Sequence, residues 1–332
     1  MLQLLIMFTG IRSCMRSLLV VVVCSSLIAC SSVPQCNKHP RSTWADQTQL
    51  NADISQLASD EFTGRDTGSE GAALTRQYLI SRFQQIGLAP WQGDYQHPFS
   101  YSASFSDKVG INVAGVVLAK KPTSQWRVVL AHYDHLGSKG TRIYYGADDN
   151  ASGVSALLQM AQQAVTQTAD VNLLFVATDA EEPGLHGGYA LVDTFAKKNI
   201  LPQTPQIELV INLDMIGRPD RRRAIYIEGA RRFDSFETIQ QSMTQSNQLC
   251  IKTRRPRAFD GSVISVDFLR ASDHYPMHQA GVPWLYFGVP THRDYHQPSD
   301  TADKIDITFV AAVVESAYQL LIIDSFLLQY SP

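Results

Sequence analysis

Histidines and carboxylates follow four apolar runs of the sequence at the point where each run ends. Imidazole and carboxylate groups bind divalent metals and carry protons in hydrolytic reactions. The runs and the residues after them are 126–131 with His132, Asp134 and His135, 171–178 with Asp179, Glu181 and Glu182, 206–213 with Asp214, and 282–289 with His292, Asp294 and His296. The acidic loop 146–153 adds Asp148 and Asp149. This pattern predicts a site assembled from several separate segments.

Each of these residues has an ordinary structural explanation when it is taken alone. Glu181 and Glu182 could cap a helix, whose N-terminal end attracts carboxylates, and Asp148 and Asp149 could occupy a turn. That explanation fails for the whole set, because so many carboxylates and imidazoles around one crevice would repel one another and lose hydration. A bound cation removes that penalty. The absence of a thiolate from the set favours zinc in a catalytic role, and the candidates suffice for two ions.

The elements that position these residues alternate between apolar runs and helical patterns. Strands are expected at 110–118, 126–131, 171–177, 206–213 and 282–287, and helices at 48–58, 71–86, 153–166, 187–198, 233–246, 271–280 and 307–328. The strands lack polar alternation, so both faces of the sheet are buried. We predict an α/β fold, a three-layer sandwich whose mostly parallel sheet carries helices on both faces. Ligands bind such sheets at the carboxyl ends of the strands.

The composition is that of a globular protein. The chain has 332 residues, 45% of them hydrophobic and 18% charged, with 20 Gly and 15 Pro. These proportions exclude disordered, collagen-like and disulfide-rich classes. A formal net charge of -3 gives no general basis for binding nucleic acid. The sequence pattern contains no repeat and no second core, so residues 44–332 are assigned to one domain.

The first 29 residues have the features of an export signal. Arg12 and Arg16 precede the apolar stretch 18–29. This stretch is shorter than the roughly 20 apolar residues that a membrane-spanning helix needs. Met15 could be the true start, because it opens a signal of ordinary length.

The end of this signal resembles a bacterial lipobox. Residues 27–30 read Leu-Ile-Ala-Cys, and in a lipobox the cysteine becomes the lipidated first residue of the mature protein. The resemblance predicts a lipoprotein anchored through Cys30 on the periplasmic side of the cell envelope. Ser31 favours the outer membrane. The polar residues 30–43 are expected to form a tether.

The cysteines do not form a disulfide framework. Of the five in the chain, Cys14 and Cys24 would leave with the signal and Cys30 would be acylated. Only Cys36 and Cys250 would remain as thiols. The periplasm permits a bridge between them, but the expected place of Cys36 in the tether argues against one.

The motifs of the chain resemble those of the co-catalytic zinc aminopeptidases of the aminopeptidase Y and secreted bacterial leucyl aminopeptidase type. The resemblance covers almost all of the chain after the signal and implies a zinc-exopeptidase fold. It rests on residues 59–65, 68–69, 132–134, 146–153, 181–182, 212–215, 272–274, 295–296 and 300–305.

Carried over position by position, the resemblance implies a centre with two zinc ions. Asp148 would be the carboxylate that bridges both ions. His132 and Asp214 would complete the protein ligands of one ion, and Glu182 and His296 those of the other.

The resemblance also implies residues that act without binding metal. Glu181 would be the general base that takes a proton from water and delivers it to the leaving amine. Asp134 would orient the imidazole of His132. A non-proline cis peptide is expected between Asp148 and Asp149. A backbone donor or a tyrosine could assist the oxyanion, and the tyrosine candidates are Tyr275, Tyr286 and Tyr295.

These roles predict a metal-dependent aminopeptidase with two Zn²⁺ per chain that acts on peptides with free N-termini. The chemistry of the site does not say which end of a peptide is bound, so a two-zinc carboxypeptidase or dipeptidase is an alternative. A glutaminyl cyclase-type acyltransferase of the same fold uses one zinc, and the full ligand set argues against it. The same set argues against a binding protein that has lost its ligands.

A basic segment, 218–257, has no role in this scheme. It contains ten Lys and Arg residues against four Asp and Glu residues. It could be an ordinary solvated surface, or it could contact anionic lipid headgroups or a substrate carboxylate. The other histidines are expected to be structural or surface groups, although His274 could line the pocket. They are His135, His186, His274, His278 and His292.

Overall fold

The computed structural model describes residues 36–103, 106–167, 169–197, 206–254 and 267–331. The predicted signal, Cys30 and the beginning of the predicted tether lie outside these residues. Within the described ranges, no helix combines the length and the apolar character needed to cross a bilayer.

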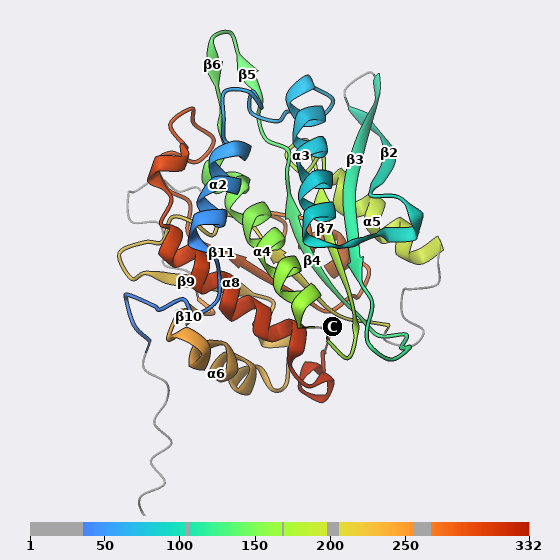
Figure 1. Ribbon diagram of the computed structural model, residues 1–332, viewed down its shortest axis with the longest axis vertical. Helices are drawn as coiled ribbons and strands as arrows, with labels where there is room; N and C mark the ends of the chain where they lie inside the picture. The colour runs from blue at the N-terminus through green and yellow to red at the C-terminus, as the bar shows by residue number, and fades with distance from the viewer. Residues whose placement is uncertain (1–35, 104–105, 168, 198–205, 255–266, 332) are drawn as a thin grey trace, which may run out of the picture. The chain divides into compact units, whose positions relative to one another are not determined.

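A mixed sheet of nine strands forms the centre of the molecule (Figure 1). The strand order is β1-β3-β7-β4-β8-β11-β9-β10, and β2 pairs with β3. The four central strands β7, β4, β8 and β11 are parallel, whereas β3 and β9 run antiparallel to their central neighbours. The bounds are β1 (Ala89–Pro90), β2 (Gln96–Ala103), β3 (Ser106–Val117), β4 (Trp126–His132), β7 (Asn172–Thr178), β8 (Ile207–Leu213), β9 (Ala224–Glu228), β10 (Cys250–Lys252) and β11 (Trp284–Gly288).

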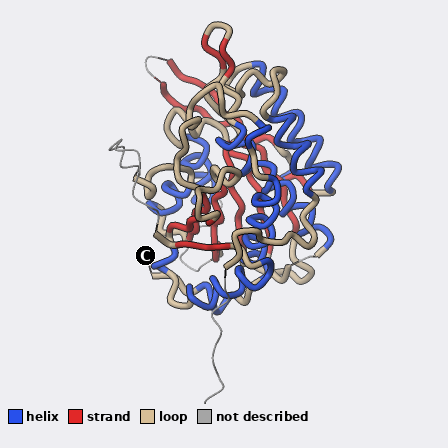
Figure 2. Tube along the Cα trace, turned by 90° about the vertical axis from the view of Figure 1, so that its left-hand side faces the viewer, coloured by secondary structure: helices blue, strands red, loops and turns tan. Residues whose placement is uncertain are grey.

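Helices cover both faces of the sheet, and Figure 2 shows them flanking the strands. On one side lie α2 (Gln47–Leu57), α3 (Glu70–Ile86), α4 (Gly153–Thr166), α6 (Phe236–Asn247) and α8 (Ile307–Ile322). On the other lie α5 (His186–Lys197) and α7 (His274–Gln279). Short turns lie at η1 (Trp91–Gly93), η2 (Ala147–Ser152), η3 (Ala230–Arg232), η4 (Ala302–Lys304) and η5 (Ser325–Leu328), and a small hairpin at β5 (Ser138–Lys139) and β6 (Arg142–Ile143).

Strand β4 shows why the sheet is buried on both sides. Val129 and Ala131 belong to the hydrophobic core under α4 and α8, whereas Val128 and Leu130 belong to the core under α5 and α7. Successive side chains of a strand point to opposite faces, so an apolar run without alternation fills two cores at once. The predicted three-layer α/β sandwich is confirmed.

Most helix limits agree with the sequence pattern to within one residue, but α6 and α7 begin three residues later than predicted and α8 ends earlier. The side chain of Ser69 accepts a hydrogen bond from the amide of Ala72 at the start of α3. Gly87, with φ 89°, ends that helix in a conformation that glycine adopts readily. The apolar pattern predicted a last helix to residue 328, but α8 ends at Ile322 because Ile323 is extended.

Strands β2, β9 and β10 were not predicted from the sequence. The 8 residues of β2 mix polar and apolar types, β9 has 5 residues and β10 only 3. Such strands depend on pairing with a neighbour more than on their own pattern. The pairing of β10 with β9 places two parts of the basic segment side by side.

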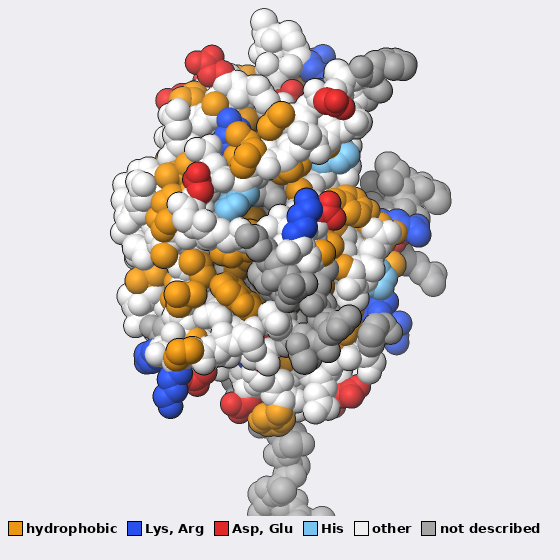
Figure 3. All heavy atoms as spheres, turned by 90° about the vertical axis from the view of Figure 1, so that its right-hand side faces the viewer, with side chains coloured by type: hydrophobic (Ala, Val, Ile, Leu, Met, Phe, Trp, Pro, Cys, Tyr) orange, Lys and Arg blue, Asp and Glu red, His pale blue; other side chains and the backbone are white. Residues whose placement is uncertain are grey.

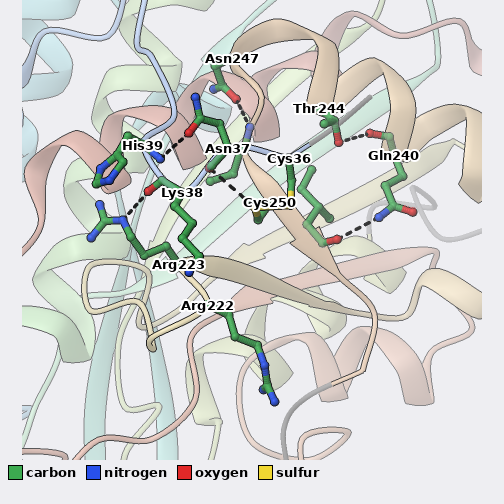
Figure 4. Close-up of a disulfide and its surroundings, with 12 residues drawn as sticks. Cys36, Asn37, Lys38, His39, Arg222, Arg223, Gln240, Thr244, Asn247 and Cys250 are labelled. Carbon is green, nitrogen blue, oxygen red and sulfur yellow. Dashed lines mark hydrogen bonds between the residues drawn. A yellow bond between two sulfur atoms is a disulfide. The ribbon is translucent and has the colours of Figure 1, made fainter. Parts of the chain in front are cut away.

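A disulfide joins Cys36 to Cys250 at the start of β10 (Figure 4). The expectation of two separate thiols was therefore wrong. The amide of Asn37 donates to the carbonyl of Gln248 at 2.7 Å. Farther along, the Glu315 carboxylate accepts hydrogen bonds from the amides of residues 43–45. The part of the predicted tether from Cys36 onward thus lies on the domain, because it has backbone and disulfide partners there.

Removing this disulfide is expected to lower the free energy of unfolding by about 2–5 kcal/mol, because the bridge limits the freedom of the unfolded chain. The test is urea unfolding of the parent and of Cys36→Ser/Cys250→Ser, each with and without reductant. The reduced parent should match the double variant, and the double variant should not respond to reductant. A parent whose midpoint is unaffected by complete reduction would contradict the expectation.

Candidate metal centre

The centre lies at the carboxyl ends of the central strands, as expected for a parallel sheet. His132 is the last residue of β4 and pairs in register with Thr178, the last residue of β7. Asp214 directly follows β8. Because these strands are parallel neighbours, the residues after them meet at one edge.

Three side chains surround His132 in the first half of the centre. Its Nε2 lies 3.3 Å from Asp149 Oδ1 and 3.4 Å from Asp214 Oδ1. Glu181 offers a further oxygen, since ligand atoms of His132, Glu181 and Asp214 all lie within 4.8 Å of one another. All four side chains are buried.

The second half of the centre shares the carboxylate of Asp149. Its Oδ2 lies 3.2 Å from His296 Nε2, which is also 3.3 Å from Glu182 Oε2. His135 Nδ1 lies 2.8 Å from Glu182 Oε1. Asp149 thus lies between His132 on one side and His296 on the other, and the two halves are neighbours.

The structure places Asp148 outside this arrangement. Its Oδ2 lies 3.0 Å from His292 Nε2, and its Oδ1 accepts a hydrogen bond from the amide of Gly217 at 2.6 Å. The position between the two imidazoles, which the sequence analysis gave to Asp148, is occupied by Asp149. The physical reason is the backbone of the loop, which directs consecutive side chains to opposite sides.

Contacts from distant segments hold this loop. Asp300 Oδ2 accepts hydrogen bonds from the amides of Asp148 and Asp149 at 3.0 and 3.2 Å. Burial first, and Asp148 second, raise the pKa of Asp300 to about 7. The side chain of Asn150 donates to the carbonyl of Leu213. The cis peptide bond joins Asp149 to Asn150, so the prediction of Asp148–Asp149 was wrong by one residue.

Asp134 holds the segment after β7. Its two carboxylate oxygens accept hydrogen bonds from the amides of Glu181 and Glu182 at 3.0 and 3.2 Å. His132 Nδ1 lies 3.2 Å from the backbone oxygen of Asp134 and 3.9 Å from its nearest carboxylate oxygen. In this geometry the side chain of Asp134 positions the two glutamates, and its backbone oxygen orients the imidazole.

Burial and charge shift the titration of the groups in this centre. Burial first, and then the carboxylates of Glu182 and Asp214, raise the pKa of Glu181 well above its usual value. Burial alone would lower the pKa of His132, but Glu181 and Asp214 raise it well above its usual value. Burial would raise the pKa of Asp149, but hydrogen bonds from His132 and His296 lower it.

Arg65 supplies a buried positive charge behind the centre without an ion pair to any of its carboxylates. The guanidinium donates to four backbone carbonyls, those of Leu57, Tyr133, Tyr145 and Gly146. Burial lowers the pKa of Arg65 to about 10, so it stays charged at neutral pH. In the sequence, Arg65 stands out only as part of the motif at residues 59–65.

Arg65→Met is expected to lower the free energy of unfolding by at least about 3 kcal/mol, because it leaves several buried carbonyls without donors. Arg65→Lys keeps the charge and some donors, so its loss should be smaller. Urea unfolding measures both, with Arg231→Met at an exposed arginine as the control. Equal free energies of unfolding for Arg65→Met and Arg65→Lys would show that these hydrogen bonds do not account for the stabilising effect of Arg65.

The remaining histidines divide into two groups. His135 and His292 contact the centre through Glu182 and Asp148, which the sequence analysis did not anticipate. His274 lies between Trp284 and Tyr286, each ring centroid 4.6 Å away. His274 is therefore a packed structural group.

Among the three tyrosine candidates, Tyr295 is closest to the centre. Its ring stacks on His296 with centroids 3.8 Å apart. Tyr275 contacts the exposed Arg270, and Tyr286 is packed against His274. Of these contacts, the one between Tyr295 and His296 reaches a residue of the centre.

The residues present fit a divalent cation. Buried imidazoles and carboxylates converge, while the Arg65 guanidinium donates to backbone oxygens. The Nε2 atom of His135 is buried and has no hydrogen-bond partner among the residues that the structure describes. Nitrogen and oxygen donors without sulfur suit zinc in a hydrolytic site.

The fold and this centre define an α/β protein with a histidine and carboxylate site of the kind found in metal-dependent hydrolases. Residues 112–321 match the pattern of Peptidase family M28, so the chain belongs to this family. The resemblance to zinc aminopeptidases that the motifs predicted is thereby confirmed.

The chain is similar to a known protein in sequence and to solved structures in fold. Aminopeptidase YwaD of Bacillus subtilis (strain 168) is 28% identical over 213 residues, which are 61% of this chain and 42% of that protein. The chain thus spans less than half the length of this relative. BSAP, a zinc aminopeptidase from Bacillus subtilis, has a TM-score of 0.65 at 16% identity over 85% of this chain and 97% of its own. The glutaminyl cyclase of Fimbriiglobus ruber has a TM-score of 0.65 at 15% identity, and the match covers 85% of this chain and 96% of that one.

Proposed function

We propose that this protein is a two-zinc aminopeptidase that hydrolyses the N-terminal residue from peptides. The observation that carries the proposal is the place of Asp149, whose two carboxylate oxygens face His132 and His296. One carboxylate with an imidazole on each side is suited to hold two cations close together.

The proposed ligand sets follow from these contacts. His132 and Asp214 would hold one ion, and Glu182 and His296 would hold the other, with Asp149 shared. When bound, the zinc ions would polarise the scissile carbonyl and make a bound water more acidic. His135 would orient Glu182 through its 2.8 Å contact.

Glu181 is the proposed general base. It is buried beside His132 and Asp214, and a carboxylate within reach of the water that the ions would hold suits the role of general base. Its carboxylate would take a proton from the attacking water and give it to the leaving amine. Tyr295 would border the substrate from beside His296.

The name of a relative favours an aminopeptidase over a carboxypeptidase. The Bacillus subtilis protein that is similar in sequence is named an aminopeptidase. Two bound Zn²⁺ ions would balance the carboxylates of the centre, so the charge of the site does not by itself select an amine or a carboxylate. The glutaminyl cyclase fold neighbour makes intramolecular cyclisation a second outcome to test.

We also propose that the protein is exported and anchored through lipidated Cys30, on the periplasmic side of the envelope and at the outer membrane. The disulfide between Cys36 and Cys250 supports an oxidising compartment. Incorporation of labelled palmitate into the parent, and its loss in Cys30→Ala, tests the anchor. If the parent protein is produced in cells but takes up no labelled palmitate, the lipid anchor is refuted.

The activity is tested with matched peptides that carry free or acetylated N-termini, before and after chelation and after zinc is restored. Cleavage confined to the free amine and restored by zinc is the expected result. Cleavage of the acetylated peptide from its other end would establish a carboxypeptidase instead. Conversion of N-terminal glutamine to pyroglutamate without hydrolysis would establish a cyclase.

A further inference from the structure

A cluster of exposed cations surrounds the place where the chain enters the domain at Cys36, at the lower left of Figure 1. Figure 4 shows Lys38, His39, Arg222 and Arg223 around the disulfide. We call five exposed cations the entry patch. They are Lys38, Arg41, Arg221, Arg222 and Lys252.

The tertiary structure brings these residues together from three segments. Lys38 follows the disulfide, and its carbonyl accepts a hydrogen bond from Arg223 Nε at 2.5 Å. The amide of Arg41 donates to the carbonyl of Asn247 at 3.2 Å. Lys252 is two residues from Cys250 on β10, so both side chains point to the same face of the strand.

The nearby carboxylates do not neutralise this patch. Asp220 lies 3.7 Å from Arg222 and accepts a hydrogen bond from Tyr226. Asp306 pairs with Arg223 at 2.6 Å, and Arg223 is not part of the patch. Arg222 still has 61% of its side chain exposed. The five cations of the entry patch and the adjacent Arg223 are thus accompanied by two carboxylates, those of Asp220 and Asp306. The region keeps an excess of positive charge.

The length of chain before Cys36 limits how far the patch can be from a membrane. Cys30, the proposed site of lipidation, is six residues before Cys36. Six residues of fully extended chain reach about 20 Å. The disulfide and the contacts of residues 37–41 prevent the rest of the predicted tether from adding to this reach.

We propose that the entry patch is a docking surface for anionic phospholipid headgroups. The inference rests on the proposed lipid anchor for its setting, while the surface itself is defined by the described residues. Clustered Lys and Arg residues beside a membrane attachment point are attracted to anionic lipid. The short connection and the charge together would hold the β10 edge of the sheet against the bilayer.

The experiment measures vesicle binding without the acyl chain. It uses protein from residue 30 onward with Cys30→Ser, since residues 36–332 form one compact unit. Co-sedimentation is compared for phosphatidylcholine vesicles with and without one third phosphatidylglycerol, at low and high salt. The expected result is binding to the anionic vesicles that high salt abolishes.

Two charge-reversal variants give the comparison. Lys38→Glu/Arg41→Glu/Arg222→Glu changes the patch and should weaken binding to anionic vesicles by at least about ten-fold. Lys120→Glu/Lys121→Glu/Lys197→Glu changes the net charge equally at exposed positions near β3 and on α5, and should leave most of the binding intact. Figure 3 shows the face that carries β2, β3 and α5, where charges of both signs are interspersed.

The outcomes separate the patch from the other proposals. Equal weakening in the two variants, or no binding by the parent, would overturn the docking surface. Peptidase activity and the thermal midpoint should be unchanged in both variants, which excludes misfolding as the cause. If the Cys30→Ser protein binds anionic vesicles but the parent takes up no palmitate in cells, the lipid anchor is refuted and the docking surface stands. If the parent takes up palmitate but the Cys30→Ser protein does not bind anionic vesicles, the docking surface is refuted and the anchor stands.

Discussion

Glu181→Gln is expected to lower kcat by about three orders of magnitude or more, since a general base contributes about 10²–10⁴-fold and also serves the leaving group here. The amide cannot accept the proton of the attacking water. Glu181 is not among the proposed metal ligands, so the zinc content should stay at the parental level. The backbone amide of Glu181 donates a hydrogen bond to the Asp134 carboxylate, and this contact should persist because the side chain takes no part in it.

The measurement is kcat and KM with a peptide that has a free N-terminus, together with zinc content by mass spectrometry. Glu237→Gln, on the exposed first turn of α6, is the matched control and should behave as the parent. Near-normal turnover in Glu181→Gln would remove this residue from the proposed mechanism. A loss of zinc would show instead that it is a ligand.

Asp149→Asn is expected to reduce zinc affinity by well over 100-fold and to abolish peptidase activity. The reason is that its carboxylate faces both imidazoles, so both proposed ions lose a charged ligand. Asp148→Asn should have a smaller effect, within the roughly 10–100-fold typical of residues that support ligands from outside. Its side chain contacts His292 and the amide of Gly217.

The pair of variants decides between two consecutive residues. Zinc binding is measured by competition with a chromogenic chelator, and circular dichroism monitors the fold. Asp148→Asn changes the same charge one residue away, so a general effect of loop charge would weaken both variants alike. If Asp148→Asn loses both ions while Asp149→Asn keeps them, Asp148 is the shared ligand, as predicted from the sequence.

Much of the fold and of the site could be predicted from the sequence. Apolar runs without alternation identified the central strands, because a strand buried on both faces has no exposed positions. Parallel strands place the residues that follow them at one edge. His132, Asp214, Glu181 and Glu182 could therefore be grouped before any coordinates were known, and the structure brings these four residues together with His296.

Other features were decided only by the tertiary structure. Which of Asp148 and Asp149 faces the two imidazoles depends on the loop backbone, which Asp300 and Asn150 hold through contacts far away in sequence. The partner of Cys36 is 214 residues away. The sequence shows the local periodicity of helices and strands and the motifs that it shares with a family. It carries no information about the direction of a side chain in an irregular loop or about which distant segments share an edge, because long-range packing sets both.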